Sequence, residues 1–373
     1  MLTPQDDLLG HQTPATFDQP SSSDLRWTER YWYSGHCVPG GDMIFDIGLG
    51  HYANRNVMDA FAGVTVGNRQ YNFRASRRLH EKTQHALDPR VGPLRFEILE
   101  GMRTHRIVLE ANDSGIAFDL RFIASTEGAQ ELQSFRRRLS RVEEDLTRMS
   151  QFARWEGWLE VAGVRYEIRP QEWWGQRDHS WGIRSEMKTD FARPPMQTHK
   201  DFLWMWCMYQ FEDFGICLFT KERSKGSNLY LSGTESPRLG RHAKARHIVG
   251  FEHALEWAND PLGQSIATGV LDFRFEDGDS RRVQIEMMPG RFYLKGGLYG
   301  GFNGWNHGDD RGAYHAEHDV WDLADPLTRE RARTLGDHVT RVTCDGAVGW
   351  GISEYGVAEG FPRYAIAQKH PAL

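Results

Sequence analysis

Short segments rich in β-branched and aromatic residues recur along the chain from residue 43 onward, separated by glycine, asparagine and aspartate. This pattern is typical of antiparallel sheets and not of alternating strands and helices. The turn sequences Asp113-Ser114-Gly115, Ala162-Gly163 and Asp277-Gly278 divide neighbouring segments and predict hairpins. The sequence therefore predicts a mainly β protein.

The expected strands fall into two runs of similar size. Consecutive prolines in Ala192-Arg193-Pro194-Pro195 favour an extended, unpaired chain, so we place the junction between the runs there. The first residues are polar and rich in proline and serine, which predicts poor order. We therefore expect a disordered leader at 1–24, an N-terminal β domain at 25–191 and a C-terminal β domain at 192–373. The two domains would be tandem antiparallel β-barrels or sandwiches.

One or two short helices are expected within this β framework. Apolar residues recur every three or four positions over about 129–149, which is the spacing of an amphipathic helix. A second helix is expected over 326–335, because Asp325 can cap it, Pro326 suits the first helical position and Gly336 suits the exit.

The charge and hydropathy of the chain exclude several classes of partner. Lysine and arginine number 45 against 51 aspartate and glutamate residues, so the formal net charge is −6. This is the wrong sign for binding nucleic acid through the overall field. No apolar stretch is long enough for a membrane span, and the N-terminus lacks the pattern of a signal peptide. We expect a cytoplasmic protein with no nucleic-acid partner and no membrane span, for which a homodimer is a compatible assembly.

The sequence also lacks the motifs of several common chemistries. Its four cysteines are too few and too scattered for a disulfide scaffold or a metal knuckle, and we expect them to be reduced. Gly48 and Gly50 do not have the GxGxxG spacing of a dinucleotide loop, and neither a GxSxG elbow nor a phosphate-binding loop occurs. We expect no cofactor, and covalent catalysis finds no support.

The chain is rich in aromatic residues, with 13 Trp, 12 Tyr and 20 Phe. Rings at this density favour large, flat, apolar binding surfaces, although they can also simply fill a β-rich core.

The densest group of polar and aromatic residues lies at 172–184, near the expected junction. Glu172, Arg177, Asp178 and His179 are the candidate catalytic residues. An imidazole beside carboxylates can exchange a proton near neutral pH, and a guanidinium can orient a carboxylate. In a strand, the even-numbered and odd-numbered residues of this segment would line two different surfaces. The alternative is a structural ion pair that joins two sheets. The substrate-binding candidates in the same segment are Trp174, Trp181 and Arg184.

Further substrate-binding candidates lie in a glycine-containing segment, in a strand that must be covered on both faces, and on a glycine-rich loop. They are His51, Tyr52 and Asn54; Trp204 and Trp206; and Tyr299, Asn303, Trp305 and His307. The sequence His315-Ala316-Glu317-His318 offers metal-binding side chains, but no further ligand lies at a diagnostic spacing, so we expect no metal site.

Three segments resemble a known superfamily. They are Phe45-Asp46-Ile47-Gly48-Leu49-Gly50-His51-Tyr52-Ala53-Asn54-Arg55, Gly92-Pro93-Leu94-Arg95, and Trp173-Trp174-Gly175-Gln176-Arg177-Asp178-His179-Ser180-Trp181-Gly182-Ile183-Arg184. These resemble the lipocalin-like superfamily that includes carotenoid 1,2-hydratase and AttH-like proteins. The resemblance implies two lipocalin-like β modules side by side, with a hydrophobic ligand cavity between or within them. It also implies a ligand class more than a reaction, because the superfamily includes both hydratases of isoprenoid double bonds and fungal cyclases.

Together these features suggest a non-redox hydratase, dehydratase, isomerase or cyclase that acts on a hydrophobic, isoprenoid-like or polycyclic molecule. Asp178 or Glu172 would donate the proton and His179 would be its partner, while Arg177 or Arg184 would orient the substrate between aromatic walls. Two alternatives remain open. One is a non-catalytic protein that binds such a ligand, and the other is a carbohydrate-active protein, since stacked indoles and paired carboxylates also suit sugars.

Overall fold

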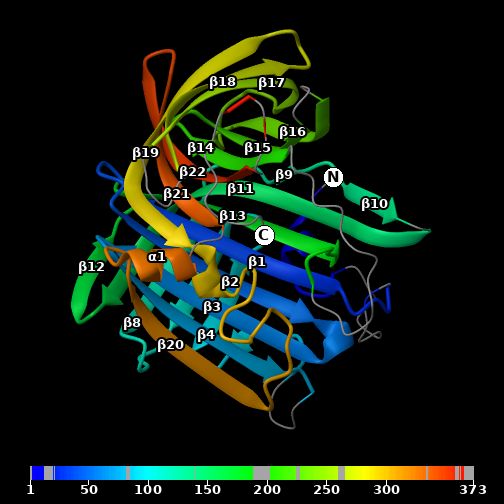
Figure 1. The fold of residues 1–373 in the computed structure, drawn as a ribbon, viewed down its shortest axis with the longest axis vertical. Coiled ribbons are helices and arrows are strands. Elements are labelled where there is room, and N and C mark those ends of the chain that lie inside the picture. Colours follow the sequence, from blue (N-terminus) through cyan, green and yellow to red (C-terminus); the bar gives the residue numbers. More distant parts are fainter. Residues whose placement is uncertain are drawn as a thin grey trace.

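The structure is a computed structural model, and it describes residues 2–11, 20, 22–80, 85–138, 140–187, 202–223, 227–258, 265–332, 335–357, 361, 363 and 364. Strands dominate these residues and form two sheets, one in the lower and one in the upper part of Figure 1. The prediction of a mainly β protein with two barrel-like sheets is confirmed.

The first sheet contains fourteen strands among the described residues. They are β1 (Trp27–Cys37), β2 (Met43–Tyr52), β3 (Val57–Val66), β4 (Arg69–Arg78), β5 (Arg90–Val91), β6 (Leu94–Glu100), β7 (Thr104–Leu109), β8 (Ile116–Ala124), β9 (Ala129–Gln130), β10 (Ser134–Arg138), β11 (Arg141–Val161), β12 (Val164–Ile168), β13 (Trp173–Ile183) and β20 (Tyr314–Asp322). Their order is β20-β4-β3-β2-β1-β13-β11-β8-β7-β6-β5, and β9, β10 and β12 pair with β11.

The second sheet is a closed barrel. Its strands, in barrel order, are β14 (Phe202–Gln210), β15 (Phe214–Arg223), β16 (Ser227–Pro237), β17 (Arg246–Trp257), β18 (Ile266–Phe275), β19 (Ser280–Tyr293), β21 (Gly336–Cys344) and β22 (Ala347–Val357). The helical elements among the described residues are η1 (Pro4–Asp7), η2 (Ala53–Arg55), η3 (Leu294–Gly297) and α1 (Pro326–Ala332).

Side-chain alternation on the central strand β1 separates two environments. Tyr31 and Tyr33 point into the hydrophobic core of the first sheet, whereas Trp32 belongs to a second cluster that includes Trp206 of β14. The Trp32 and Trp206 ring centroids lie 5.2 Å apart in an edge-to-face arrangement. The outer face of the barrel therefore packs on the face of the first sheet that points away from that sheet's own core.

Glycine allows this close packing at one position of β3. A Cβ at Gly63 would lie 2.1 Å from the ring of Phe292 in β19. A side chain there would force the barrel away from the first sheet, so the absence of a side chain at Gly63 is part of the interface.

The prediction of a helix over about 129–149 is wrong. The described residues of this segment form β9, β10 and the start of the long strand β11, and Leu132 and Phe135 from the apolar repeat are exposed. Arg136 instead pairs with Glu143 across the β10–β11 hairpin, at 3.1 Å. Cross-strand pairing of alternating charges outweighs the helical spacing of a few apolar residues.

The short C-terminal helix is confirmed as α1. The Asp325 carboxylate accepts a hydrogen bond of 3.0 Å from the backbone N–H of Thr328, as expected of a capping residue. Gly336 follows as the first residue of β21.

The expectation of a disordered leader does not hold for residues 2–11. This segment contains η1 and inserts Asp7, which is fully buried, into the first sheet. An ion pair inside the sheet fixes it, as described below. Residues 12–19 of the expected leader lie outside the described residues.

The domain division of the chain stays a prediction, because the expected junction at 192–195 lies outside the described residues. The C-terminal half also contributes one strand to the first sheet, since β20 pairs with β4 at the edge of that sheet.

Among the described residues, no helix has the length and apolar character needed to cross a bilayer. All four cysteines are free thiols, as predicted.

Candidate functional site

Most of the polar and aromatic segment 172–184 forms β13 (Trp173–Ile183), and the structure confirms that its side chains divide between two faces. β13 lies between β1 and β11 at the centre of the first sheet. Arg177 and His179 point into the core of that sheet, whereas Asp178 and Ser180 point toward the barrel. The interpretation of Asp178 and His179 as a proton-exchanging pair is therefore wrong, because adjacent strand residues face opposite sides.

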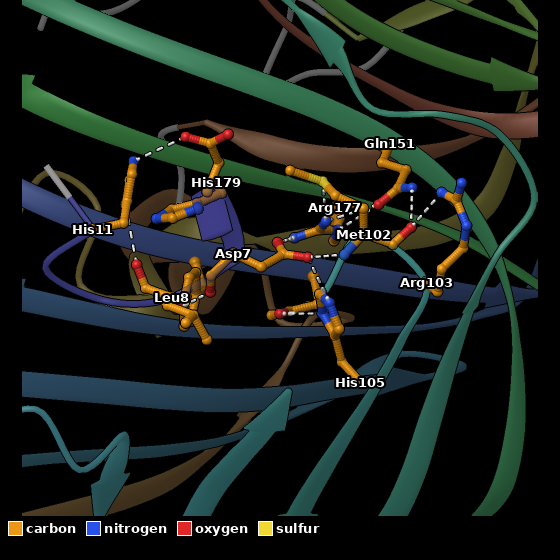
Figure 2. Close-up of polar contacts among 12 residues, drawn as sticks. Asp7, Leu8, His11, Met102, Arg103, His105, Gln151, Arg177 and His179 are labelled. Atoms are coloured by element: carbon orange, nitrogen blue, oxygen red, sulfur yellow. Dashed lines mark hydrogen bonds and ion pairs between the residues drawn. The ribbon is translucent and has the colours of Figure 1, made fainter. Parts of the chain in front are cut away.

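The inner face contains a buried ion pair. Arg177 donates to the Asp7 carboxylate at 2.6 Å and to the Gln151 side chain at 2.7 and 2.9 Å. Figure 2 shows Asp7 between Arg177 and His105, whose Nε2 lies 3.1 Å from it. Asp7 also accepts a hydrogen bond from the backbone N–H of Met102. Arg177 is thus fully engaged by structural partners, and its proposed role as substrate orienter loses support.

Burial alone would raise the pKa of Asp7, but the charge of Arg177 and the contacts with His105 outweigh it and hold that pKa well below its usual value. The carboxylate is therefore ionised across the physiological pH range and neutralises a guanidinium that is itself completely buried.

The face of β13 toward the barrel carries a second polar network. Arg148 of β11 lies 3.5 Å from the Asp178 carboxylate and 3.6 Å from that of Glu131. Glu131 also accepts a hydrogen bond of 3.1 Å from the indole N–H of Trp206 in the barrel. Arg184 donates to Ser180 at 2.6 Å beside Asp178. This network joins the first sheet to the barrel through charged groups that keep little contact with solvent.

Three further carboxyl groups meet at the same interface: Asp46 of β2, Asp337 of β21 and Glu354 of β22. Burial raises the pKa of Asp46 to about 7. Burial and the charge of Asp46 raise the pKa of Asp337 well above its usual value, and burial and the charge of Asp337 do the same for the pKa of Glu354. At neutral pH, carboxyl groups in this cluster are held in the neutral, proton-donating form.

A row of buried polar side chains extends across the first sheet from Asp46. The strand register places Ser34 of β1 between Asp46 and Gln176 of β13. All three residues are fully buried. The Asp46 carboxyl contacts Ser34 and Asp337, whereas the amide oxygen and nitrogen of Gln176 have no hydrogen-bond partner among the described residues. Because buried polar atoms are nearly always paired, this row has the capacity to bind water or the polar part of a ligand.

His36 follows in the next row of β1, and neither of its ring nitrogens has a partner among the described residues. Burial and the nearby charge of Arg154 lower the pKa of His36 to about 3, so its imidazole is neutral. Trp174 covers this end of the site, with the Arg154 guanidinium 3.4 Å from its ring centroid.

The glycine-rich loop between η3 and β20 covers the opposite end. Asp59 of β3 accepts hydrogen bonds from the Tyr52 hydroxyl at 3.1 Å and from the Gly308 backbone N–H at 2.8 Å, and it lies 3.3 Å from His307. Tyr299 packs edge-to-face on His307, with ring centroids 5.0 Å apart. Asp59 therefore fixes the loop over the first sheet.

Arg30 of β1 places a positive charge at the end of the site that the glycine-rich loop covers. Its guanidinium donates to the Tyr52 hydroxyl at 3.2 Å and lies 5.7 Å from the ring centroid of Tyr299. The charge of Arg30 acts near Asp59, whereas Arg148 and Arg184 act on the carboxyl group of Glu354.

The structure brings many of the sequence-predicted residues to the interface between the first sheet and the barrel. Those that contribute to its networks or rings are Asp178, Arg184, Trp174, Tyr52, Trp206, Tyr299 and His307.

Other predicted residues lie elsewhere. Glu172 is exposed and pairs with Arg169, so it is a poor candidate for a buried acid. Asn54 hydrogen-bonds the backbone of Ser22 and Asp24, and Asn303 lies exposed in a turn with a φ of 49°. Trp305 of the glycine-rich loop is fully buried, and Trp204 packs on Phe219. His179, Trp181 and His51 lie around Glu29 inside the first sheet.

Sequence reasoning missed Arg148, Asp337 and Asp7 as site or core-forming groups. Arg148 lies in the segment for which a helix is expected, and Asp7 lies in the expected leader. Asp337 follows a glycine in a strand whose sequence carries no further signal. Its raised pKa depends on burial and on its contact with Asp46 across the interface. Asp46 does lie in a segment that the sequence analysis singles out, at 45–55.

Comparisons with known proteins support the fold. The structure is similar to that of a protein from Nitrosomonas europaea described as AttH, with a TM-score of 0.54, 13% identity, and coverage of 93% of this chain and 98% of that one. Weaker likenesses are to kievitone hydratase from Nectria haematococca, with a TM-score of 0.44, 12% identity and coverage of 88% of both chains, and to CghA with Sch210972 bound, with a TM-score of 0.46, 11% identity and coverage of 90% of both chains.

The lipocalin-like resemblance expected from the sequence is thus confirmed at the level of the fold. A search of curated proteins finds no significant match. A family profile covers almost the whole chain, from residue 2 to residue 359. The chain therefore belongs to this family, which is described as a family of unknown function (DUF8625).

Proposed function

We propose that this protein is a non-redox enzyme that acts on a hydrophobic, isoprenoid-like or polycyclic small molecule by acid/base catalysis at the interface between the first sheet and the barrel. The reaction class is hydration or dehydration, isomerisation or cyclisation. The fold alone does not choose a reaction, so the proposal rests on the chemistry of the site.

The observation that carries the proposal is the cluster of Asp46, Asp337 and Glu354. A carboxyl group that stays protonated near neutral pH can act as a general acid, which an ordinary ionised carboxylate cannot. The raised pKa values of these groups follow from burial and from mutual repulsion across the interface. Placing acids from both sheets together costs stability, and such arrangements are concentrated at functional sites.

A hydration step can be written with these groups. A carboxyl of the Asp46–Asp337 pair transfers its proton to one carbon of a substrate double bond, which leaves a carbocation on the other carbon. A water molecule forms the new carbon–oxygen bond and returns a proton to the carboxylate. The ring faces of Trp32 and Trp206 can stabilise the cation, as aromatic quadrupoles stabilise other cations.

The remaining groups suit substrate orientation. Arg148 and Arg184 lie beside Asp178 and can hold an oxygen-bearing end of the substrate by charge-assisted hydrogen bonds. The Gln176 amide, which has no hydrogen-bond partner among the described residues, can position water or a substrate hydroxyl beside Ser34. Isomerisation or cyclisation would use the same acid without addition of water.

The test begins with native mass spectrometry of compounds that copurify with the protein. Linear and cyclic isoprenoid alkenes are then incubated with the enzyme in water labelled with heavy oxygen. We expect turnover by the parent, with label in the product if the reaction is hydration and without label if it is isomerisation or cyclisation. The variant Asp337→Asn should lose turnover by about 100-fold or more, the effect of removing a general acid.

The control is Asp272→Asn, which alters an exposed aspartate of β18 that pairs with Arg282 and should leave turnover unchanged. Retention of an apolar compound by a parent protein that never converts it would contradict the proposal and favour a non-catalytic binding protein. Unchanged turnover in Asp337→Asn would also refute the assigned acid.

A further inference from the structure

Inside the first sheet, on the side of β1 and β13 opposite to the proposed active site, three histidine side chains surround one carboxylate. Glu29 of β1 is fully buried. Its Oε1 lies 3.1 Å from Nε2 of His179 and 3.3 Å from Nδ1 of His11, and its Oε2 lies 3.9 Å from Nδ1 of His51. The ligand atoms of His11, Glu29 and His179 all lie within 4.8 Å of one another.

The geometry points to a metal site: we propose that His11, Glu29, His51 and His179 bind one divalent transition-metal ion such as Zn²⁺. Three imidazoles and one carboxylate are the ligand types that zinc and its neighbours in the first transition row prefer, whereas magnesium and calcium prefer oxygen alone. Ligand atoms about 2.0–2.2 Å from a metal lie roughly 3–3.5 Å from one another. The atoms of His11, Glu29 and His179 already lie within 4.8 Å of one another, and Nδ1 of His51 lies 3.9 Å from Oε2 of Glu29, so an ion would draw the four groups together by small side-chain movements.

The strongest single observation is the orientation of His51. Its ring is about nineteen-twentieths buried, and its Nδ1 points toward Glu29 without a hydrogen-bond partner among the described residues. At 3.9 Å it is too far from the carboxylate for a hydrogen bond. An ion between the two groups would satisfy both, while a hydrogen-bonded network of His11, Glu29 and His179 alone leaves the nitrogen of His51 unexplained.

Groups around the cluster fit the outer shell of a metal site. Oδ1 of Asp6 lies 3.5 Å from Nε2 of His11, on the far side of the ring from Glu29, in the carboxylate–histidine arrangement that orients metal ligands. The Gly10 backbone N–H donates to Oε2 of Glu29 at 3.0 Å. The Nδ1 of His11 also lies 3.0 Å from the Leu8 carbonyl, so metal binding would replace that hydrogen bond with a metal bond.

Aromatic rings enclose the ligands. Trp181 packs edge-on against His11 at 4.6 Å between centroids, and Tyr31 packs in the same way against His179 at 4.7 Å. With four protein ligands and this shell, the site has the character of a structural metal centre and not of a catalytic one, which would keep a position open for substrate or water.

The origin of the ligands indicates what the ion would do. Glu29, His51 and His179 come from the adjacent strands β1, β2 and β13, but His11 comes from the N-terminal segment. Figure 2 shows His11 and His179 side by side within this region. The ion would therefore fasten residues 2–11 to the first sheet, next to the ion pair between Asp7 and Arg177.

The test measures the metal content of the full chain, purified through a tag that does not use histidine. We expect mass spectrometry of the elements to find about one zinc or related ion per chain after gel filtration. Co²⁺ added to the chelator-treated protein should produce the visible absorption bands of a low-coordinate site, and Tm should fall on chelation and rise again with Zn²⁺.

The variants His51→Ala and His11→Ala should both lose the bound ion and the cobalt bands, while His247→Gln, which changes an exposed histidine of β17, should keep them. His11 lies in the N-terminal segment and not in a strand, so its variant should still fold. A parent protein that retains no ion and whose Tm does not respond to Zn²⁺ or Co²⁺ would overturn the proposal. Equal metal binding by the parent and His51→Ala would overturn it as well.

Discussion

Replacement of Asp7 by alanine should destabilise the protein more than any other change in the N-terminal segment. The substitution removes the carboxylate that Arg177, His105 and the Met102 backbone N–H contact in a site without solvent. Arg177 keeps its bonds to Gln151, but its Nη1 would lose its partner. Breaking one side of a buried ion pair typically costs about 3–5 kcal/mol.

The assay is thermal unfolding followed by circular dichroism. The entropy of unfolding grows with chain length, so in a chain of 373 residues about 1.3 °C of Tm corresponds to each kcal/mol. We therefore expect Tm to fall by about 4–6 °C in Asp7→Ala. The matched control is Asp6→Ala, which removes a partly exposed carboxylate that accepts from the Thr3 backbone N–H at 2.6 Å. That change should cost about 1 kcal/mol, the usual effect of losing a cap.

The pH dependence provides a second readout. The folded pKa of Asp7 lies below its unfolded value of about 4, so its contribution to stability is complete above pH 4 and is lost as the pH falls further. The parent should therefore lose more stability than Asp7→Ala on acidification below pH 4. If Asp7→Ala were as stable as Asp6→Ala, or if both variants responded equally to acid, the buried ion pair would not fix the N-terminal segment.

Three other changes have defined outcomes. The folded state holds a proton on Asp46 up to about pH 7, whereas the unfolded state releases it near pH 4. Stability should therefore decrease between these pH values, by up to about 4 kcal/mol for this group, and the raised pKa of Asp337 acts in the same direction. Thermal unfolding from pH 4 to 8 should show a smaller decrease in Asp337→Asn, and an identical decrease would refute the raised pKa values. Gly63→Ala would place its Cβ against Phe292 and should cost about 1–3 kcal/mol, measured by chemical denaturation; an unchanged midpoint would argue against the close packing. Asp59→Ala should release the loop at 299–309, which hydrogen exchange would detect as faster exchange at Gly308, whereas unaltered exchange would show that the loop is held by other contacts.

The parts of the fold that depend on local geometry could be predicted from the sequence. The alternation of side chains along β13 is a property of any strand, so the sequence predicts that Asp178 and His179 lie on opposite faces. The interpretation of these two residues as proton partners did not take this alternation into account. Capping of α1 by Asp325 is likewise local. Hairpin turns and the resemblance of the segment at 173–184 gave the fold class.

The parts that depend on contacts distant in sequence could not be predicted. Asp46 and Asp337 meet only because the barrel packs on the outer face of the first sheet, and no periodicity in either segment encodes this. Asp7 lies in a polar segment whose composition resembles that of a disordered leader, and only Arg177, a buried charge in need of a partner, explains its position. The apolar spacing of Leu132 and Phe135 suggested a helix because spacing alone does not show whether side chains are buried.

The central claim is that a carboxyl group at the interface between the first sheet and the barrel stays protonated at neutral pH. Infrared spectroscopy of protein labelled with carbon-13 aspartate detects the carbonyl stretch of a protonated side chain directly. We expect such a band at pH 7 in the parent and its loss or strong reduction in Asp337→Asn. A parent protein in which every aspartate has lost this band by pH 5 would contradict it.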